Sequence, residues 1–240
     1  MHFSHDPHVA DQAAHYAAIL ARDGIVQIPN FLPEKLAEKL YLFLQGNEDW
    51  HQIINSGEKT FELPRMARST MSDTQKTDLD TAIYAGARFG FQYRYETIRV
   101  PDSAEARADK SDPLTAFAQF MTQSAQAGVL QSVVGRADII LADAQATAYS
   151  PGDFLTRHDD AVAGKGRVAA YVMGLTPGWR IEWGGLLLVH QDDGVRVDGY
   201  CPAFNTITLF TVPILHSVSE VTRAAPYRRI SVTGWLRTNN

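Results

Sequence analysis

The hydrophobic period of this chain changes near residue 137, and that change limits what the chain can fold into. Before it, apolar side chains recur at helical spacing, whereas short strand-like runs follow one another after it. Many short strands separated by turn signals are typical of a β-sandwich or a β-barrel. We therefore predict an α+β protein with a C-terminal β-core of about eight strands. The runs are ADIILADAQATAY, FLTRHDD, GRVAAYVMGL, GGLLLVH, VRVDGY, NTITLFTVP and RRISVTGWL.

The N-terminal part predicts about four helices that support this core. A short strand, GIVQIPNF, follows the first of them, and the third opens with a capping-box pattern, Ser72-x-x-Gln75. Residues 47–70 show neither period and are predicted to be irregular. The helices are predicted at residues 9–22, 33–46, 72–86 and 112–128.

Four aromatic side chains, Phe89, Phe91, Tyr93 and Tyr95, alternate with other residues. This two-residue repeat predicts a strand with its aromatic face turned to the core. The strand and the irregular stretch 47–70 are also candidates for a segment that closes over a substrate.

At 240 residues, with 45% hydrophobic and 20% charged residues, the chain is predicted to form one domain, residues 1–240. Residues 1–136 would supply helical support and lead-in strands, and residues 137–240 the core. No apolar run approaches the roughly 18 residues of a membrane helix, so no membrane partner is expected. The N-terminus shows no export signal, which makes the cytoplasm the expected compartment.

The single Cys201 excludes an internal disulfide framework and a cysteine-cluster metal site, so a metal would need histidines and carboxylates. A net charge of −5 without a basic block argues against a nucleic-acid partner. The phosphate-binding loop, the dinucleotide fingerprint and the serine-hydrolase elbow are absent from the sequence.

The pattern His-x-Asp occurs twice, at residues 158–160 and 190–192. On a strand, residues i and i+2 point the same way, so such a pair directs an imidazole and a carboxylate to one metal ion. The second pair runs into Asp193-Gly194, a turn signal, and is interpreted as a strand end. The first pair, His158 and Asp160, is the candidate metal site, with a solvated charged turn as its alternative.

His216, in PILHSVSEV, is the candidate third ligand, and a buried core histidine is the alternative. Two histidines and one carboxylate would form the facial triad that holds Fe(II) with open coordination positions. Arg229 lies on the next strand-like run, where a guanidinium is costly without an anionic partner. An organic-acid carboxylate is a partner that this side chain could hold at two points.

These residues together resemble the signature of the Fe(II) and 2-oxoglutarate dependent dioxygenases. HSVSEV and RRISVTGW are similar to the ending of the prolyl hydroxylase-like branch of that superfamily. The resemblance covers residues 140–238 and implies a double-stranded β-helix, the jelly-roll fold of cupin-like proteins. The residues that carry it are Tyr149, His158, Asp160, His216 and the run Arg229 to Trp235.

Roles follow from the resemblance. It implies that His158, Asp160 and His216 bind Fe(II), while Arg229 pairs with the distal carboxylate of 2-oxoglutarate. Arg228 competes for that role, but counting back six residues from the family's tryptophan selects Arg229.

Hydroxyl groups are candidates for further bonds to the same carboxylate, those of Ser231, Tyr171 and Tyr149. Gln145, Thr147 and Tyr149 also alternate with alanines, so this face either lines the pocket or is simply half-exposed.

The implied activity is hydroxylation of a C–H bond coupled to oxidative decarboxylation of 2-oxoglutarate, with dioxygen as co-substrate and ascorbate as a further candidate cofactor. Related halogenases have a small residue in place of the carboxylate, so Asp160 favours hydroxylation. The leading substrate is a prolyl residue in a protein or peptide, and a free amino acid or small metabolite is an alternative. A non-catalytic cupin-like binding module is an alternative of a different class, which Arg229 argues against. The oligomeric state stays open.

Overall fold

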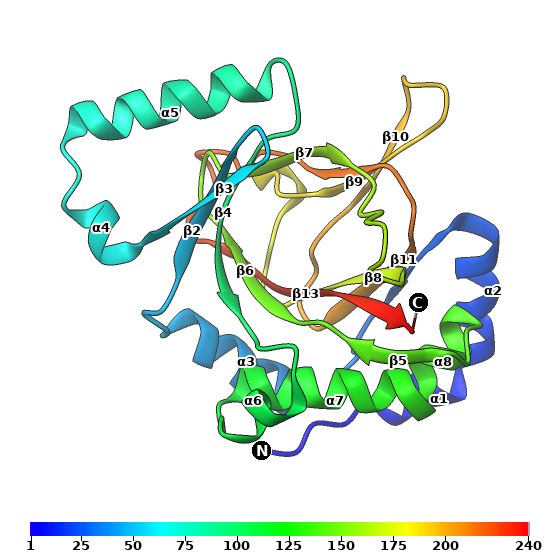
Figure 1. Ribbon diagram of the computed structural model, residues 1–240. Helices are drawn as coiled ribbons and strands as arrows, with labels where there is room; N and C mark the ends of the chain where they lie inside the picture. The colour runs from blue at the N-terminus through cyan, green and yellow to red at the C-terminus, as the bar shows by residue number, and fades with distance from the viewer. Residues whose placement is uncertain (240) are drawn as a thin grey trace.

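The computed structural model describes residues 1–239, apart from the side chains of residues 125–127. Its strands form one hydrogen-bonded sheet that curls on itself into a half-barrel (Figure 1). One run of neighbouring strands is β1 (Ile25–Ile28), β11 (Thr206–Thr211), β8 (Arg167–Gly174), β13 (Arg229–Thr238) and β6 (Gln145–Tyr149). The other run is β7 (Phe154–His158), β12 (His216–Val218), β9 (Leu187–His190) and β10 (Val197–Tyr200), and β4 (Tyr93–Arg99) pairs with both β6 and β7.

The two runs face each other across an apolar layer. Ala170 of β8 and Phe210 of β11 pack in one cluster with Leu187 and Val189 of β9. All the strand pairs are antiparallel, and several neighbours in space are distant in sequence, such as β8 with β13 and β1 with β11. This arrangement confirms the predicted α+β fold with a jelly-roll core.

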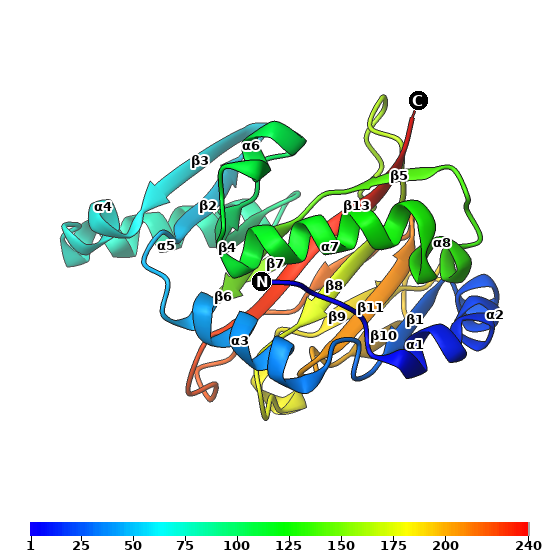
Figure 2. The same ribbon diagram turned by 90° about the horizontal axis from the view of Figure 1, so that it is seen from below.

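Helices cover the outer face of the first run, where Figure 2 shows α7 lying across the strands. The alternation within β6 explains the contact, because Ala146 and Ala148 face the helices and are fully buried in the main core. Ile230 and Val232 of β13 belong to the same cluster. The covering helices are α1 (Pro7–Asp11), α2 (Ala13–Asp23), α3 (Glu34–Gln45), α7 (Pro113–Ala127) and α8 (Val129–Val134).

The predicted helices are confirmed, with one change. The first is broken at Gln12 into α1 and α2, while α5 (Asp73–Ala87) begins with the capping box of Ser72 and Gln75. The short elements α6 (Ala104–Ala108), α8 and the 3-10 turn η1 (Ile181–Trp183) carry too few residues to show a period and were not predicted.

The prediction that residues 47–70 are irregular is wrong. They form the hairpin of β2 (His51–Ser56) and β3 (Lys59–Pro64), followed by α4 (Arg65–Ser69), and β2 pairs with β4 to extend the sheet. In β3 almost every residue is exposed, so no buried face marks the sequence as a strand.

The aromatic stretch 89–95 also differs from the prediction. β4 begins only at Tyr93, Phe89 is 92% exposed and Phe91 is 48% exposed. These rings therefore do not form a core-facing strand. The run ADIILADAQATAY likewise contains two strands, β5 (Ile139–Ala142) and β6, which both pair with β13 and are separated by residues 143–144.

Within the described residues, the helices are all too short or too polar to cross a membrane.

Candidate active site

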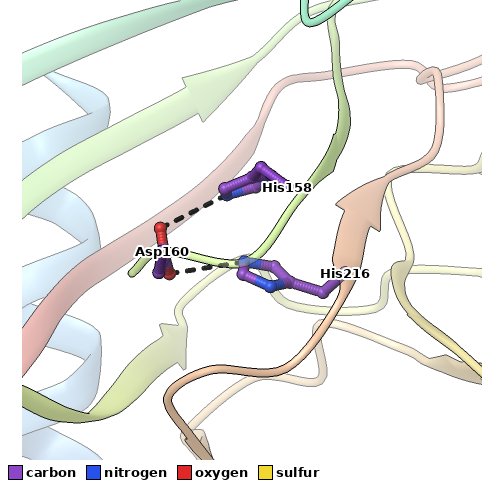
Figure 3. A group of neighbouring side chains, drawn as sticks. All are labelled: His158, Asp160 and His216. Atoms are coloured by element: carbon purple, nitrogen blue, oxygen red, sulfur yellow. Dashed lines mark ion pairs between the residues drawn. The ribbon is translucent and has the colours of Figure 1, made fainter. Parts of the chain in front are cut away.

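Three metal-ligand side chains meet inside the half-barrel. His158 ends β7, His216 begins β12, and the two are register partners in the antiparallel pair β7–β12. Figure 3 shows Asp160 between the two imidazoles, with Nε2 of His158 3.3 Å from Oδ1 and Nε2 of His216 3.4 Å from Oδ2. One ligand atom from each residue lies within 4.8 Å of the others, so a single ion can be bound by all three.

The histidine rings are oriented by backbone carbonyls. Nδ1 of His158 lies 3.0 Å from the Thr156 carbonyl oxygen, and Nδ1 of His216 lies 2.9 Å from the Ile214 carbonyl oxygen. A carbonyl can only accept, so each Nδ1 carries a proton and each Nε2 is the ring nitrogen that faces Asp160. Backbone acceptors on both Nδ1 atoms fit a divalent metal bound through Nε2.

Asp160 reaches the site by a different route from the predicted one. The strand ends at His158, and Asp160 lies beyond it with a φ of 61°, in the left-handed region. The prediction that the two residues share one face of a strand is therefore wrong in its geometry, although the ligands are correct. As expected, Arg157 and Asp159 are exposed.

Charges around Asp160 keep its carboxylate ionised. Burial raises the pKa of Asp160, but hydrogen bonds and charge from His158 and His216 outweigh burial and hold the pKa below its usual range. An ionised carboxylate beside two imidazole Nε2 atoms is the donor set preferred by Fe(II) in facial-triad sites.

A cavity of about 490 Å³ contains the triad. Its polar wall is the face of β6 that carries Gln145, Thr147 and Tyr149. Of the two interpretations of this face, the one in which it lines the pocket is therefore correct. The opposite wall includes Leu187 and Val218 from the second run. A mainly pre-formed, partly polar pocket between the two runs suits a small organic acid at the metal.

Arg229 lies in this cavity and has no counter-ion among the described residues. Its side chain is 2% exposed, its Nε has no hydrogen-bond partner, and Cζ lies 5.1 Å from the centre of the Tyr149 ring. Burial lowers the pKa of Arg229, while Tyr149 and Cys201 oppose that effect. An unpaired guanidinium in an apolar setting fits the carboxylate of 2-oxoglutarate, which would supply the missing charge.

Thr147 and Ser231 are register partners beside Arg229, and both hydroxyls are buried without a hydrogen-bond partner. Thr147 lines the cavity, whereas Ser231 does not. Tyr149 lines it too, and its ring stacks on Tyr95 at a centroid distance of 5.0 Å. The roles of Ser231 and Tyr149 at the carboxylate therefore stay predictions, and Thr147 joins them as a residue with a free hydroxyl.

Tyr171 does not fit its predicted role. Its side chain packs in the main core under the helices, and its hydroxyl donates to the Asp143 carbonyl oxygen at 2.6 Å. Along β8 it alternates with Ala170 and Val172, which face the other run. This parity places the Tyr171 ring on the opposite face of the sheet from Arg229, and although the residue borders the cavity, its hydroxyl is already bound to the Asp143 carbonyl oxygen.

The second His-x-Asp pair lies at a strand end, as its turn signal predicted. His190 is the last residue of β9, and its Nε2 lies 2.9 Å from the Ser217 Oγ. Asp192 is exposed in the turn that follows. Among the described residues, the metal-ligand cluster is that of His158, Asp160 and His216.

Arg167 is a pocket residue that sequence reasoning missed. Its guanidinium stacks on Trp235 with Cζ 3.5 Å from the ring centre, and one nitrogen donates to the Asp160 carbonyl oxygen at 3.0 Å. Its Nε is buried without a partner. The sequence marks it only as the first residue of a strand after a glycine loop, which carries no chemical signal.

The comparisons with known proteins agree with this geometry. A family model described as the 2OG-Fe(II) oxygenase superfamily matches residues 144–237, which span β6 to β13 and include the triad and Arg229. A comparison with curated proteins found no match.

Solved structures of the same fold include a prolyl-4-hydroxylase from Pseudomonas putida, with 21% identity, a TM-score of 0.58, and 95% of this chain and 100% of that chain covered. Another is a prolyl hydroxylase from Trichoplax adhaerens in complex with a hypoxia inducible factor peptide, at 16% identity and a TM-score of 0.61, covering 96% and 91% of the two chains. A non-heme alpha ketoglutarate dependent epimerase from nogalamycin biosynthesis also matches, at 15% identity, a TM-score of 0.58, and coverage of 96% and 83%. At these identities the likeness shows the fold alone.

Proposed function

Since the chain belongs to the 2OG-Fe(II) oxygenase superfamily, we propose that it hydroxylates a prolyl residue in a protein or peptide, with Fe(II) and 2-oxoglutarate. The observation that carries this proposal is the lining of the cavity. The buried Arg229, the triad and a row of aromatic rings, Phe91, Tyr93 and Tyr95, all border it.

The aromatic row runs from the exposed Phe91, which lies beside the triad, to Tyr95, which stacks on Tyr149. Phe91 lies 5.5 Å from both the His158 ring and the Tyr93 ring, and Tyr93 lies 5.7 Å from Tyr95. The Tyr93 hydroxyl is 2.8 Å from Oγ1 of Thr60, so the β2–β3 hairpin borders the same entrance. Aromatic-lined grooves bind proline-rich segments, whose extended conformation costs little entropy to hold. The row therefore supports a prolyl peptide as the substrate.

Each part of the pocket has a task in this reaction. Bound iron, 2-oxoglutarate and dioxygen supply the oxidising chemistry, in which 2-oxoglutarate gives succinate and carbon dioxide and a substrate C–H bond becomes C–OH. His158, Asp160 and His216 would hold the metal and leave its other positions open. Arg229 would hold the distal carboxylate of 2-oxoglutarate, and the apolar walls would exclude water.

Mass spectrometry tests the proposal directly. Purified protein with Fe(II), 2-oxoglutarate and ascorbate is incubated with a library of proline-containing peptides, and both succinate and a mass gain of one oxygen are measured. We expect the gain on proline, its loss when that proline is replaced by alanine, and no gain with the Asp160→Ala variant. Oxygen placed on another residue type would contradict the prolyl assignment.

A free amino acid or a small carboxylic acid is the second candidate, and Arg167 favours it. This cation lies beside the triad with an unpaired, buried Nε and could hold a substrate carboxylate. Free proline and its N-acetylated amide, assayed side by side, separate the two candidates. Turnover of the free acid alone, lost in Arg167→Gln, would replace the peptide by the small molecule.

A further inference from the structure

Glu96 is a buried carboxylate on the outer face of β4, opposite the aromatic row. Its side chain is 4% exposed and pairs with three arginines from two distant segments. Arg65 and Arg68 come from α4, where Arg65 Nε lies 3.3 Å from Oε1 and Arg68 pairs with the same oxygen. Arg228 is the residue immediately before β13, and its Nη1 donates a hydrogen bond to Oε2 of Glu96 at 2.7 Å.

The position of Arg228 gives this contact a consequence for the active site. Arg229 is the first residue of β13, and its register partner Tyr149 is the last residue of β6. Both pocket residues thus lie at the end of a strand ladder, where pairing opens most easily. Adjacent strand residues face opposite sides, so fixing Arg228 on the outer face turns Arg229 inward.

We propose that Glu96 is a positioning residue, which acts through Arg228 to hold Arg229 at the distance from the metal that 2-oxoglutarate requires. The proposal rests on the role of Arg229 given under the proposed function. β6 lies between β4 and β13, and its Ala148 is the register partner of both Glu96 and Ile230. The Glu96–Arg228 pair therefore ties β4 to the start of β13 across β6.

The low solvent exposure of the Glu96–Arg228 ion pair supports a strong interaction between the two side chains. The Arg228 side chain is 22% exposed and lies over Trp50, with Cζ 5.2 Å from the ring centre. A hydrogen-bonded ion pair with one buried partner is screened less by water than a surface pair, and removing Glu96 would leave the Arg228 charge without its partner. Arg65 also pairs with Glu48, whereas the ion pair of Arg228 among the described residues is with Glu96.

A pair of matched variants tests the proposal. Arg228→Gln removes the ion pair of Glu96 with the neighbour of Arg229. Arg65→Gln removes an arginine on the α4 side of the same carboxylate whose side chain is similarly exposed, 28% against 22% for Arg228. The dissociation constant of 2-oxoglutarate is measured by titration calorimetry on Mn(II)-loaded protein. We expect Arg228→Gln and Glu96→Gln to weaken binding by roughly 3- to 20-fold, and Arg65→Gln to leave it unchanged.

Selectivity for chain length separates positioning from general stability. 2-Oxoadipate is one methylene longer than 2-oxoglutarate, so a displaced Arg229 should reduce the preference for 2-oxoglutarate over 2-oxoadipate. Arg228→Lys keeps a charge for Glu96 and should restore most of that preference. Equal weakening by Arg65→Gln and Arg228→Gln, or an unchanged preference in Arg228→Gln and Glu96→Gln, would overturn the proposal.

Arg229→Gln distinguishes failure of this proposal from failure of the proposed function. If this variant does not weaken 2-oxoglutarate binding, Arg229 does not hold the distal carboxylate. The role of Arg229 in the proposed function and the positioning role of Glu96 would then both be wrong. If Arg229→Gln weakens binding and Arg228→Gln does not, only the positioning role of Glu96 is wrong.

Discussion

The two aspartates that follow His158 occupy opposite environments, and their contrast belongs to the scale of single residues. Asp160 lies between two histidine Nε2 atoms in the cavity, whereas Asp159 is exposed and its Oδ1 accepts a hydrogen bond from the Ala161 amide at 3.0 Å. The contacts of Asp160 are those of a metal ligand, whereas the hydrogen bond of Asp159 only stabilises a turn.

We therefore expect Asp160→Ala to lower succinate formation by more than about 100-fold, because one of three metal ligands is lost. Asp159→Ala should retain the bound metal and nearly full activity. Metal content by elemental analysis and succinate formation, measured for both variants, check this. A metal-free Asp159→Ala would mean that the turn itself, and not Asp160 alone, builds the site.

At the scale of elements, strands β8 and β13 depend on close backbone approach. Gly234 is the register partner of Tyr171, and a Cβ at Gly234 would overlap the carbonyl oxygen of Asp143, a backbone atom that cannot rotate away. The same carbonyl accepts the hydrogen bond of the Tyr171 hydroxyl. The absence of a side chain at this position thus lets β13 lie close to the backbone of Asp143, between β5 and β6.

Gly234→Ala is expected to lower the free energy of unfolding by about 1–3 kcal/mol, since β13 or the backbone at Asp143 has to shift. Gly90→Ala is the matched control, because nothing lies within 4 Å of a Cβ there. Urea denaturation of the two variants and the wild type gives the comparison. An unchanged free energy of unfolding in Gly234→Ala would show that the backbone at Asp143 moves aside at little cost.

Elements also show where sequence reasoning succeeded and where it did not. The triad was predictable because each ligand lies in a short motif, and β6 and β13 alternate regularly between core and pocket. The β2–β3 hairpin was not, since β3 has no buried face and gains its structure from pairing with β2. Arg167 and Glu96 were missed for a related reason: their partners, Trp235 and Arg228, are distant in sequence.

At the scale of the whole molecule, stability should depend on pH through a buried carboxyl group. Asp153 is 3% exposed, and burial raises its pKa to about 7, although the Ser150 amide and Arg94 act against this and Glu96 acts with it. In the unfolded chain the same group titrates near pH 4. Between those values the folded state binds the extra proton, so its stabilising effect is full below about pH 4 and is lost as the pH rises towards 7.

We expect the unfolding free energy of the wild type, relative to Asp153→Asn, to fall between pH 5 and 7 by at most about 1.4 kcal/mol per pH unit. Urea denaturation of both proteins at half-unit steps of pH measures the difference. Parallel curves for the two proteins would show that Asp153 is already ionised at pH 5.

The pairing of His158 with His216 has one more consequence. β12 has only three residues, so few backbone hydrogen bonds tie it to β7, and its register with β7 shifts between His216 and Val218. A metal held by both histidines would close the chain between them into a loop and cross-link β7 to β12. The ion that serves the chemistry would then also be a folding ligand, and metal supply would set how much of the protein is folded.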